Sequence, residues 1–406
     1  MKKQILIFII ILSIFNISAQ TKNEVLEAKV NATLLKALHQ YEYMISLLPS
    51  GSFPKTYDSN KDQLETSDSE WWCSGFYPGC LLYLNEEFNL PVLDLEIDKV
   101  LNNLKKEQYN TTTHDLGFMM YCSFGNAERL NPKPEYKEVL MNSAKSLASR
   151  YDDTVQAIRS WDSASWNNAG EDDLVVIIDN MMNLELLFWA SRYSGDSTYY
   201  NIAVNHAEKT LKNHFRNNYS SFHEVIYDES TGAVKAQLTN QGAADDSSWA
   251  RGQAWGLYGY VVMYRETRNP KYLEQANNIV NFLLNHPNMP KDMIPYWDYD
   301  APNIPNALRD SSSAAIIASA LIELENYVDN EMKQEYHNKA ELILESLLTP
   351  EYIAEIGTNG CFILKHGVGN MPNYTEIDAP LSYGDYYLIE AMMRYKKQNL
   401  VDRTKK

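Results

Sequence analysis

The 406-residue chain is short of basic charge, of cysteine and of long apolar runs, and each shortage excludes a class of protein. Its 36 lysine and arginine residues face 53 acidic ones, a formal charge of -17, which argues against nucleic-acid binding because that requires a basic surface. Four cysteines are too few for a disulfide scaffold, although Cys73 and Cys80 could pair. We therefore expect the chain to fold as one large domain around a hydrophobic core.

Motifs for several catalytic chemistries are also missing. The histidines are scattered, and no two stand at metal-ligand spacing on one predicted helix. The chain has neither a glycine-rich phosphate loop nor a Gly-x-Ser-x-Gly nucleophile elbow. We expect no metal and no cofactor.

Residues 1–19 are built like a secretory signal. Two lysines open the segment, residues 5–15 form a short apolar run, and residues 17–19 supply a small-residue cleavage site. No later apolar stretch is long enough to span a bilayer, and no cysteine follows the cleavage site closely enough for a lipid anchor. We expect a single mature domain of residues 20–406 with no membrane anchor, periplasmic or secreted, as a monomer or homodimer.

Helical periodicity dominates the mature sequence. Some segments are apolar nearly all round and others carry charge on one face, so that the first kind is buried and the second covers it. This alternation predicts an all-α toroid with inner and outer helices, although a plain helical solenoid fits nearly as well. One β-hairpin is expected at residues 221–237. The expected helices are residues 25–48, 134–150, 174–193, 197–215, 249–267, 271–284, 312–328 and 332–348.

A carboxylate and two amides interrupt the apolar helix predicted at residues 174–193. Asp179 and Asn183 stand four residues apart and would share a face of that helix. Burial raises the pKa of a carboxyl group, which is how a general acid is made for neutral pH. A structural aspartate bonded to neighbouring backbone fits the same segment.

A second carboxylate follows three threonines at residues 111–113. These threonines can cap a helix whose first turn holds His114 and Asp115, where the helix dipole would keep Asp115 ionised. Two carboxyl groups with opposite protonation preferences suit hydrolysis at a sugar ring. The alternative for Asp115 is ordinary capping.

Residues 240–260 combine an arginine, aromatic residues and glycines. Asp246 or Ser247 is expected to cap a helix that places Arg251, Trp255 and Tyr258 on one face. The same helix contains three glycines, each about 1 kcal/mol less favourable than alanine: Gly252, Gly256 and Gly259. They indicate either tight helix packing or a ligand, with Arg251 on a carboxylate and Trp255 under a ring.

Aromatic residues also recur in polar loops, where sugar rings could stack on them. They occur at residues 71–77, 161, 166 and 296–299.

Taken together, these stretches resemble the unsaturated glucuronyl hydrolases, glycoside hydrolase family 88. The matching stretches occur in the family's order and span nearly the whole mature chain. They are Trp-Cys-Ser-Gly-Phe-Tyr-Pro-Gly at 72–79, His-Asp-Leu-Gly-Phe at 114–118, Ile-Asp-Asn-Met-Met-Asn at 178–183, Arg-Gly-Gln-Ala-Trp-Gly at 251–256 and Ile-Asp-Ala-Pro-Leu-Ser-Tyr-Gly-Asp-Tyr-Tyr at 377–387.

The resemblance implies an (α/α)6 barrel and a glycosidase that removes the 4,5-unsaturated glucuronic acid from lyase-generated oligosaccharides of ulvan or glycosaminoglycan type. The reaction would be hydration of the C4=C5 double bond, with Asp179 protonating C4 and assisting water at C5, and Asp115 as the second essential carboxylate. The same resemblance implies that the pocket for the unsaturated sugar is lined by His223, Gln241, Arg251 and Trp255, with Trp72 and His114 nearby. The enzyme would act downstream of a polysaccharide lyase.

One position departs from the family pattern. The family commonly reads Thr-His-Gln-Gly-Tyr where this chain has Thr-Asn-Gln-Gly-Ala at residues 239–243. Asn240 cannot carry the charge or transfer the proton that a histidine could, which bears on the preferred linkage or sulfation of the substrate.

Two other functions remain open from the sequence. An unsaturated rhamnogalacturonyl hydrolase would have similar chemistry, but those enzymes typically read Arg-Gly-Asn-Gly-Trp where this chain has Arg-Gly-Gln-Ala-Trp at residues 251–255. A non-catalytic carbohydrate-binding protein made of helical repeats is the second alternative, although such proteins are usually lipid-anchored. A lyase of toroid fold would create the unsaturated sugar rather than consume it.

Overall fold

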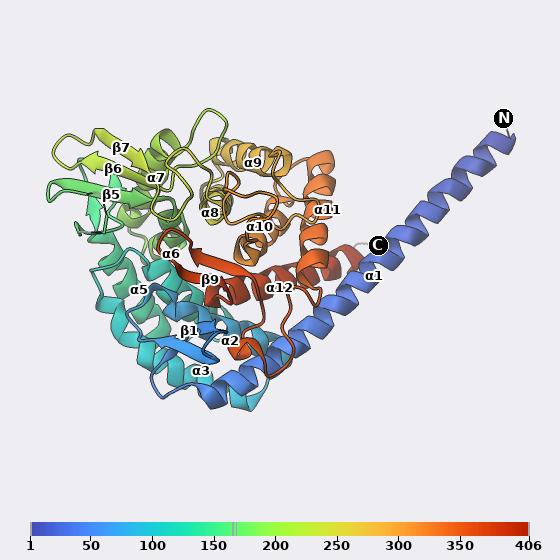
Figure 1. Ribbon diagram of the computed structural model, residues 1–406, viewed down its shortest axis with the longest axis horizontal. Helices are drawn as coiled ribbons and strands as arrows, with labels where there is room; N and C mark the ends of the chain where they lie inside the picture. The colour runs from blue at the N-terminus through green and yellow to red at the C-terminus, as the bar shows by residue number, and fades with distance from the viewer. Residues whose placement is uncertain (1, 165, 168, 405–406) are drawn as a thin grey trace.

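The computed structural model describes the backbone of residues 2–164, 166–167 and 169–404, and the side chains of residues 24–400 within those ranges. Helices dominate, and the N-terminal part of the first helix extends away from the rest of the molecule (Figure 1). No helix within the described part of the chain is long and apolar enough to cross a membrane.

Six helix pairs form a closed ring, so the predicted (α/α)6 barrel is confirmed. The inner elements contact one another in sequence, and the last contacts the first. They are α2 (Phe76–Phe88), the π-helical segment η3 (Gly117–Gly125), α6 (Leu184–Ser194), α8 (Ala250–Thr267), α10 (Ser311–Leu324) and α12 (Ser382–Thr404). The outer helices are α1 (Lys2–Leu47), α3 (Pro91–Leu104), α5 (Pro134–Ala148), α7 (Ser197–Asn213), α9 (Pro270–Asn285) and α11 (Asn330–Leu347), and the short α4 (Asn126–Leu130) continues η3.

Local signals place four of the outer helices, α5, α7, α9 and α11, close to their predicted positions, whereas α2, α3 and α12 were not predicted. Asp196, Asn269 and Asp329 cap α7, α9 and α11, each accepting a hydrogen bond from a backbone N–H of the first turn. Pro134 and Pro270 occupy the first turn of α5 and α9, where proline leaves no helical hydrogen bond unmade. Each of these helices buries one face against an inner helix, as the charge on the other face predicts.

The structure contradicts the helix predicted over residues 174–193. Its first part is strand β5 (Asp173–Ile177), followed by a 3-10 segment η4 (Ile178–Asn183), and only then does α6 begin. β5 pairs with β6 (Glu224–Asp228), and a run rich in valine and isoleucine suits a strand buried on both faces. Asp179 and Asn183 therefore lie in η4, not on one face of an α-helix.

The predicted hairpin is confirmed as β6 and β7 (Val234–Leu238), which form a three-stranded sheet with β5 at one side of the barrel (Figure 1). Three further two-stranded sheets were not predicted. They pair β1 (Phe53–Asp58) with β2 (Gln63–Ser67), β3 (Tyr151–Asp152) with β4 (Ala157–Ile158), and β8 (Gly367–Asn370) with β9 (Thr375–Ala379). Short 3-10 turns complete the fold at η1 (Trp72–Gly75), η2 (Lys105–Tyr109) and η5 (Asn359–Cys361).

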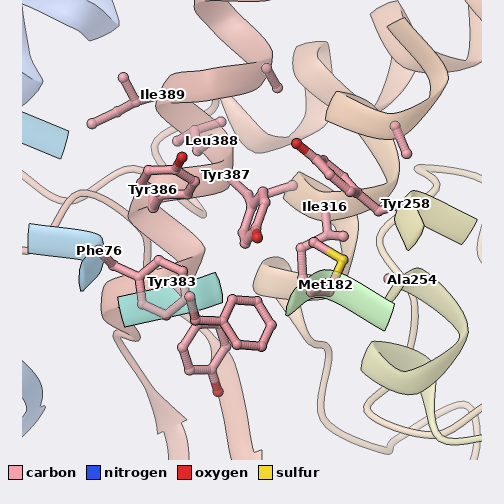
Figure 2. Packing of buried hydrophobic residues seen from close by; sticks show 14 of the residues in the cluster. Phe76, Met182, Ala254, Tyr258, Ile316, Tyr383, Tyr386, Tyr387, Leu388 and Ile389 are labelled. Atoms are coloured by element: carbon pink, nitrogen blue, oxygen red, sulfur yellow. The ribbon is translucent and has the colours of Figure 1, made fainter. Parts of the chain in front are cut away.

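The core fills the barrel axis with aromatic side chains of the inner helices. Phe76 of α2 contacts Tyr383, Tyr386 and Tyr387 of α12, with ring centroids 5.4–6.1 Å apart (Figure 2). Tyr258 of α8 contacts Tyr387 from the opposite side, at 5.5 Å. Because these rings fill the middle of the barrel, polar side chains near the axis are confined to its two ends.

The cysteine pairing left open by the sequence does not occur. Cys73 and Cys80 are both buried and both free, as are Cys122 and Cys361. Packing, without a disulfide bond, holds these four cysteines in place.

Candidate active site

The close approach of η4 to helix α8 positions Asp179. A Cβ atom on Gly259 would lie 2.5 Å from Cβ of Met181, and one on Gly252 would lie 3.3 Å from Cγ2 of Ile178. Of the two explanations for the glycines of α8, tight packing is therefore the one observed. The element packed there is the segment that carries Asp179.

Asp179 is a buried carboxyl group with one oxygen atom that accepts no hydrogen bond within the described part of the chain. Its side chain is 11% exposed, and its Oδ2 atom makes no hydrogen bond to any described residue. Burial raises the pKa of Asp179 to about 7, the nearby Asp115 adds to the rise, and the positive charge of Arg251 opposes it. Asp179 can therefore hold a proton at neutral pH and release it to a bound ligand.

Asp115 lies just before η3. Its carbonyl accepts a hydrogen bond from Met119 N–H, and Thr113 both accepts from the backbone N–H of Asp115 and donates to its carboxylate, each at 3.1 Å. Burial nevertheless raises the pKa of Asp115 to about 7, while Thr113, Arg150 and Asn183 favour its ionised form. Desolvation therefore opposes the predicted dipole effect of about 0.3–1 kcal/mol, and Asp115 is close to half ionised at neutral pH.

His114 is a buried, neutral neighbour of Asp115. Its Nε2 atom lies 3.4 Å from Oδ1 of Asp115, and burial lowers its pKa to about 3, assisted by the charge of Arg150. The structure therefore brings His114 to the site as a hydrogen-bonding group rather than as a cation.

His223 faces Asp179 from the strand side. Its Nδ1 atom accepts a hydrogen bond from the backbone N–H of Asn240 at 2.9 Å, so we assign the proton to Nε2, which lies 3.7 Å from Oδ2 of Asp179. The ring lies between Trp161 and Trp249, and burial lowers its pKa to about 3. Asn240 thus acts on His223 through its backbone.

Arg251 binds the C-terminal hairpin as well as facing the site. Its guanidinium donates to the carbonyls of Val368 and Gly369, at 2.5 and 2.6 Å, and to Oε1 of Gln241 at 2.8 Å. It is 3% exposed and stacks over Trp249. Arg251 and Gln241 therefore form one unit that fixes β8 beside the two carboxyl groups.

The start of α8 differs from its prediction. Neither Asp246 nor Ser247 caps the helix, which begins at Ala250 after Trp249 with no side-chain cap. The hydroxyl of Ser247 donates instead to Asp298, at 2.6 Å. The polar residues before α8 therefore fold the adjoining loop rather than end the helix.

Aromatic rings line the interior of the site. Trp72 lies against Tyr383, with centroids 5.0 Å apart. Trp255 is fully buried between Phe118 and Tyr387, which leaves no open face for a sugar ring. Its Nε1 atom makes no hydrogen bond among the described residues, and it favours the ionised form of Asp179. Trp255 thus offers an N–H group, not a stacking platform.

Four residues near the site were given no site role from the sequence: Asn180, Asn183, Tyr383 and Arg150. Asn180 and Asn183 were visible as polar breaks in an apolar run, and Tyr383 lies within a matching stretch. Arg150 gave no local signal, since it reaches the site only through the fold, donating to the carbonyl of Thr111 at 2.7 Å.

Metal binding finds no support in the side chains present. Within the residues that the structure describes, no group of three or more histidine, cysteine, aspartate or glutamate side chains could hold a metal ion. A pair of carboxyl groups with raised pKa values is instead suited to proton transfer.

Comparison with known proteins gives a consistent result. The family model described as Glycosyl Hydrolase Family 88 matches residues 50–397. An unsaturated glucuronyl hydrolase of Formosa agariphila is 45% identical over 353 residues, covering 87% of this chain and 86% of that protein. An unsaturated chondroitin disaccharide hydrolase of Streptococcus pyogenes serotype M1 is 30% identical, with 85% of each chain covered.

Solved structures agree with the sequence comparisons. The crystal structure of an unsaturated glucuronyl hydrolase specific for heparin superimposes with a TM-score of 0.88 at 41% identity, covering 92% of this chain and 98% of that one. The enzyme from Streptococcus agalactiae superimposes with a TM-score of 0.85 at 29% identity, covering 92% and 93%. The chain therefore belongs to glycoside hydrolase family 88. It is a glycosidase with the activity of an unsaturated glucuronyl hydrolase on unsaturated uronyl saccharides.

Proposed function

We propose that the enzyme hydrates the C4=C5 double bond of a terminal unsaturated glucuronic acid, rather than attacking its anomeric carbon. The observation that carries the proposal is the pair of buried carboxyl groups, Asp179 and Asp115, each with a pKa near 7. At neutral pH each group is about half protonated, so one can act as an acid while the other is ionised.

Each step of the hydration has a group to perform it. Protonated Asp179 gives its proton to C4, and the electron pair of the double bond forms the new C–H bond. Water adds at C5, where positive charge develops, and its proton returns to the Asp179 carboxylate. Ionised Asp115 stabilises the developing charge, and the hemiketal then opens and releases the neighbouring sugar.

The remaining site residues would bind the unsaturated sugar. Arg251 and Gln241 provide polar contacts beside the acid, His223 presents its Nε2–H group, and Trp72 and His114 border the same space. The Trp255 N–H group stabilises the carboxylate form of Asp179. These polar and charged groups suit an anionic, hydroxyl-rich ligand.

We propose ulvan-type or glycosaminoglycan-type oligosaccharides as the substrates, supplied by a polysaccharide lyase. The named relatives act on glucuronyl, chondroitin or heparin saccharides. A panel of lyase-generated unsaturated disaccharides, followed by loss of alkene absorbance, would identify the polymer. Loss on at least one member supports the proposal, and no loss on any member contradicts it.

The chemistry itself is tested in deuterated water. Hydration by a positioned acid transfers a deuteron to one face of C4, so NMR spectra recorded early in the reaction should show a single C4 deuterium of one configuration. Attack at the anomeric carbon first releases the unsaturated sugar, whose later tautomerisation in solution places deuterium on C4 without preference for either face. That result would overturn the hydration mechanism.

We also propose that residues 1–19 are removed on export and that residues 20–406 form the mature periplasmic or secreted domain, as a monomer or homodimer. The length and charge pattern of the N-terminal segment support this processing. Mass spectrometry of the secreted protein tests it, since an N-terminus at Met1 would contradict cleavage.

A further inference from the structure

The two segments that carry the carboxyl groups are joined by two asparagines of η4. Asn183 accepts a hydrogen bond from the backbone N–H of Phe118 at 3.0 Å, through Oδ1. The approach is close, since a Cβ atom on Gly117 would lie 2.4 Å from Cα of Asn183. Asn180 donates to the carbonyl of Ile158 at 3.0 Å and favours the protonated form of His114.

The hydrogen bond to Phe118 uses only the amide oxygen of Asn183, so the amide nitrogen is a hydrogen-bond donor that this contact leaves unused. The residue is fully buried, and its Nδ2 atom makes no hydrogen bond that satisfies distance and angle with any described residue. Its amide nevertheless lies close enough to Asp115 to lower the pKa of that carboxyl group. A buried amide donor with no other use therefore faces one member of the carboxyl pair.

We propose that Asn183 is a positioning residue that keeps Asp115 ionised opposite a protonated Asp179. This inference rests on the proposed hydration mechanism, in which the two carboxyl groups have different tasks. The amide donor stabilises a carboxylate and cannot accept a proton, so it disfavours protonation of Asp115. It adds to the effect of the Thr113 hydroxyl, which donates to the same carboxylate.

Other groups around Asp115 bear on its charge and stay unchanged when Asn183 is replaced. They are Arg150, which favours the carboxylate, His114, whose Nε2 lies at 3.4 Å, Asp179 of η4, and the thiol of Cys73 in η1. Loss of the amide should therefore raise the pKa of Asp115.

The test compares Asn183→Ala with the wild type and with Asn126→Ala. Asn126 is a buried asparagine at the other end of η3, where it donates to Cys122 and Tyr386 and faces no carboxyl group of the site. Asn183→Ala should move the acidic limb of the kcat/KM profile up by about one pH unit and lower its maximum, as expected when a nearby amide donor that favours the carboxylate is removed. Asn126→Ala should lower Tm but leave the acidic limb of the kcat/KM profile at the same pH as in the wild type.

A second variant at the same position distinguishes the loss of the donor from a general loss of folding. Asn183→Leu keeps the branched shape of the side chain in this fully buried place but removes the donor and adds no titrating group, and it should also move the acidic limb upward. The proposal is overturned if both Asn183 variants lower the rate equally at every pH, as a structural role requires. Wild-type activity on an unsaturated disaccharide tests the proposed function separately, because the profile shift is measured only against an active wild type.

Discussion

Replacing Gly259 with alanine should displace the active-site segment η4, although Gly259 itself lies outside the active site. The new Cβ would lie 2.5 Å from Cβ of Met181, whereas non-bonded carbon atoms need roughly 3.5–4.0 Å. Because the obstructing atom is the first carbon of the Met181 side chain, η4 itself must move by about 1 Å. Overpacking of this kind lowers the free energy of unfolding by about 1–3 kcal/mol. The better helix propensity of alanine offsets about 1 kcal/mol of this loss.

The displacement should reach the chemistry because Asp179 stands two residues before Met181. A misplacement of about 1 Å can lower a rate by about 10²-fold, so we expect kcat/KM of Gly259→Ala to fall by roughly that factor. The assay is the loss of alkene absorbance on an unsaturated disaccharide, with Tm measured in parallel.

Gly256 provides the matched control on the same helix. Its added Cβ would meet the far ends of side chains, Cζ of Phe215 at 3.3 Å and Cδ1 of Ile178 at 3.6 Å. Gly256→Ala should therefore keep its activity and match or exceed the wild-type stability, by up to about 1 kcal/mol. If Gly259→Ala proves as active as Gly256→Ala, the packing of α8 does not position Asp179.

Three further substitutions have defined outcomes. Glu224 is fully buried with both oxygens unpaired in the described structure, and burial raises its pKa from 4.5 to about 7. Stability is therefore lost as pH rises from about 4.5 through 7, so Glu224→Gln should raise the free energy of unfolding by roughly 1–3 kcal/mol more at about pH 8 than at about pH 5. An equal effect at both pH values would contradict this. Arg251→Lys replaces the two-nitrogen fork that bonds Val368, Gly369 and Gln241 by one ammonium nitrogen, and kcat/KM should fall by about 10–100-fold. Retained activity is the contrary result. Asn240→His should change the relative rates across the disaccharide panel, and an unchanged substrate profile would refute a specificity role.

Four of the outer helices, α5, α7, α9 and α11, were predictable because their signals are local, whereas α3 was not predicted. A capping residue such as Asp329 and an apolar stripe along one face are both properties of a short stretch of sequence. The segment at residues 173–183 was not predictable in the same way, since a buried strand and a buried helix are equally apolar. Only the pairing of β5 with β6 distinguishes them, and that pairing joins residues about fifty positions apart.

The site was predictable in its residues more than in its electrostatics. Asp115 and Asp179 stood out as carboxylates in apolar surroundings, and the structure brings them together. The depth to which η3 and η4 bury Asp115 is a property of the whole barrel, and so its raised pKa could not be read from the neighbouring threonines. Arg150 likewise reaches the site through tertiary contacts alone.

The central claim is that Asp179 is the proton donor for hydration. The most direct measurement is alkene loss by wild type and by Asp179→Asn, on the same substrate and with matched thermal stability. Asparagine preserves the shape of the residue but cannot give up a proton, so the rate should fall by about 10²–10⁴-fold while the substrate still binds. An Asp179→Asn enzyme that removes the alkene at a rate near that of the wild type would contradict the claim.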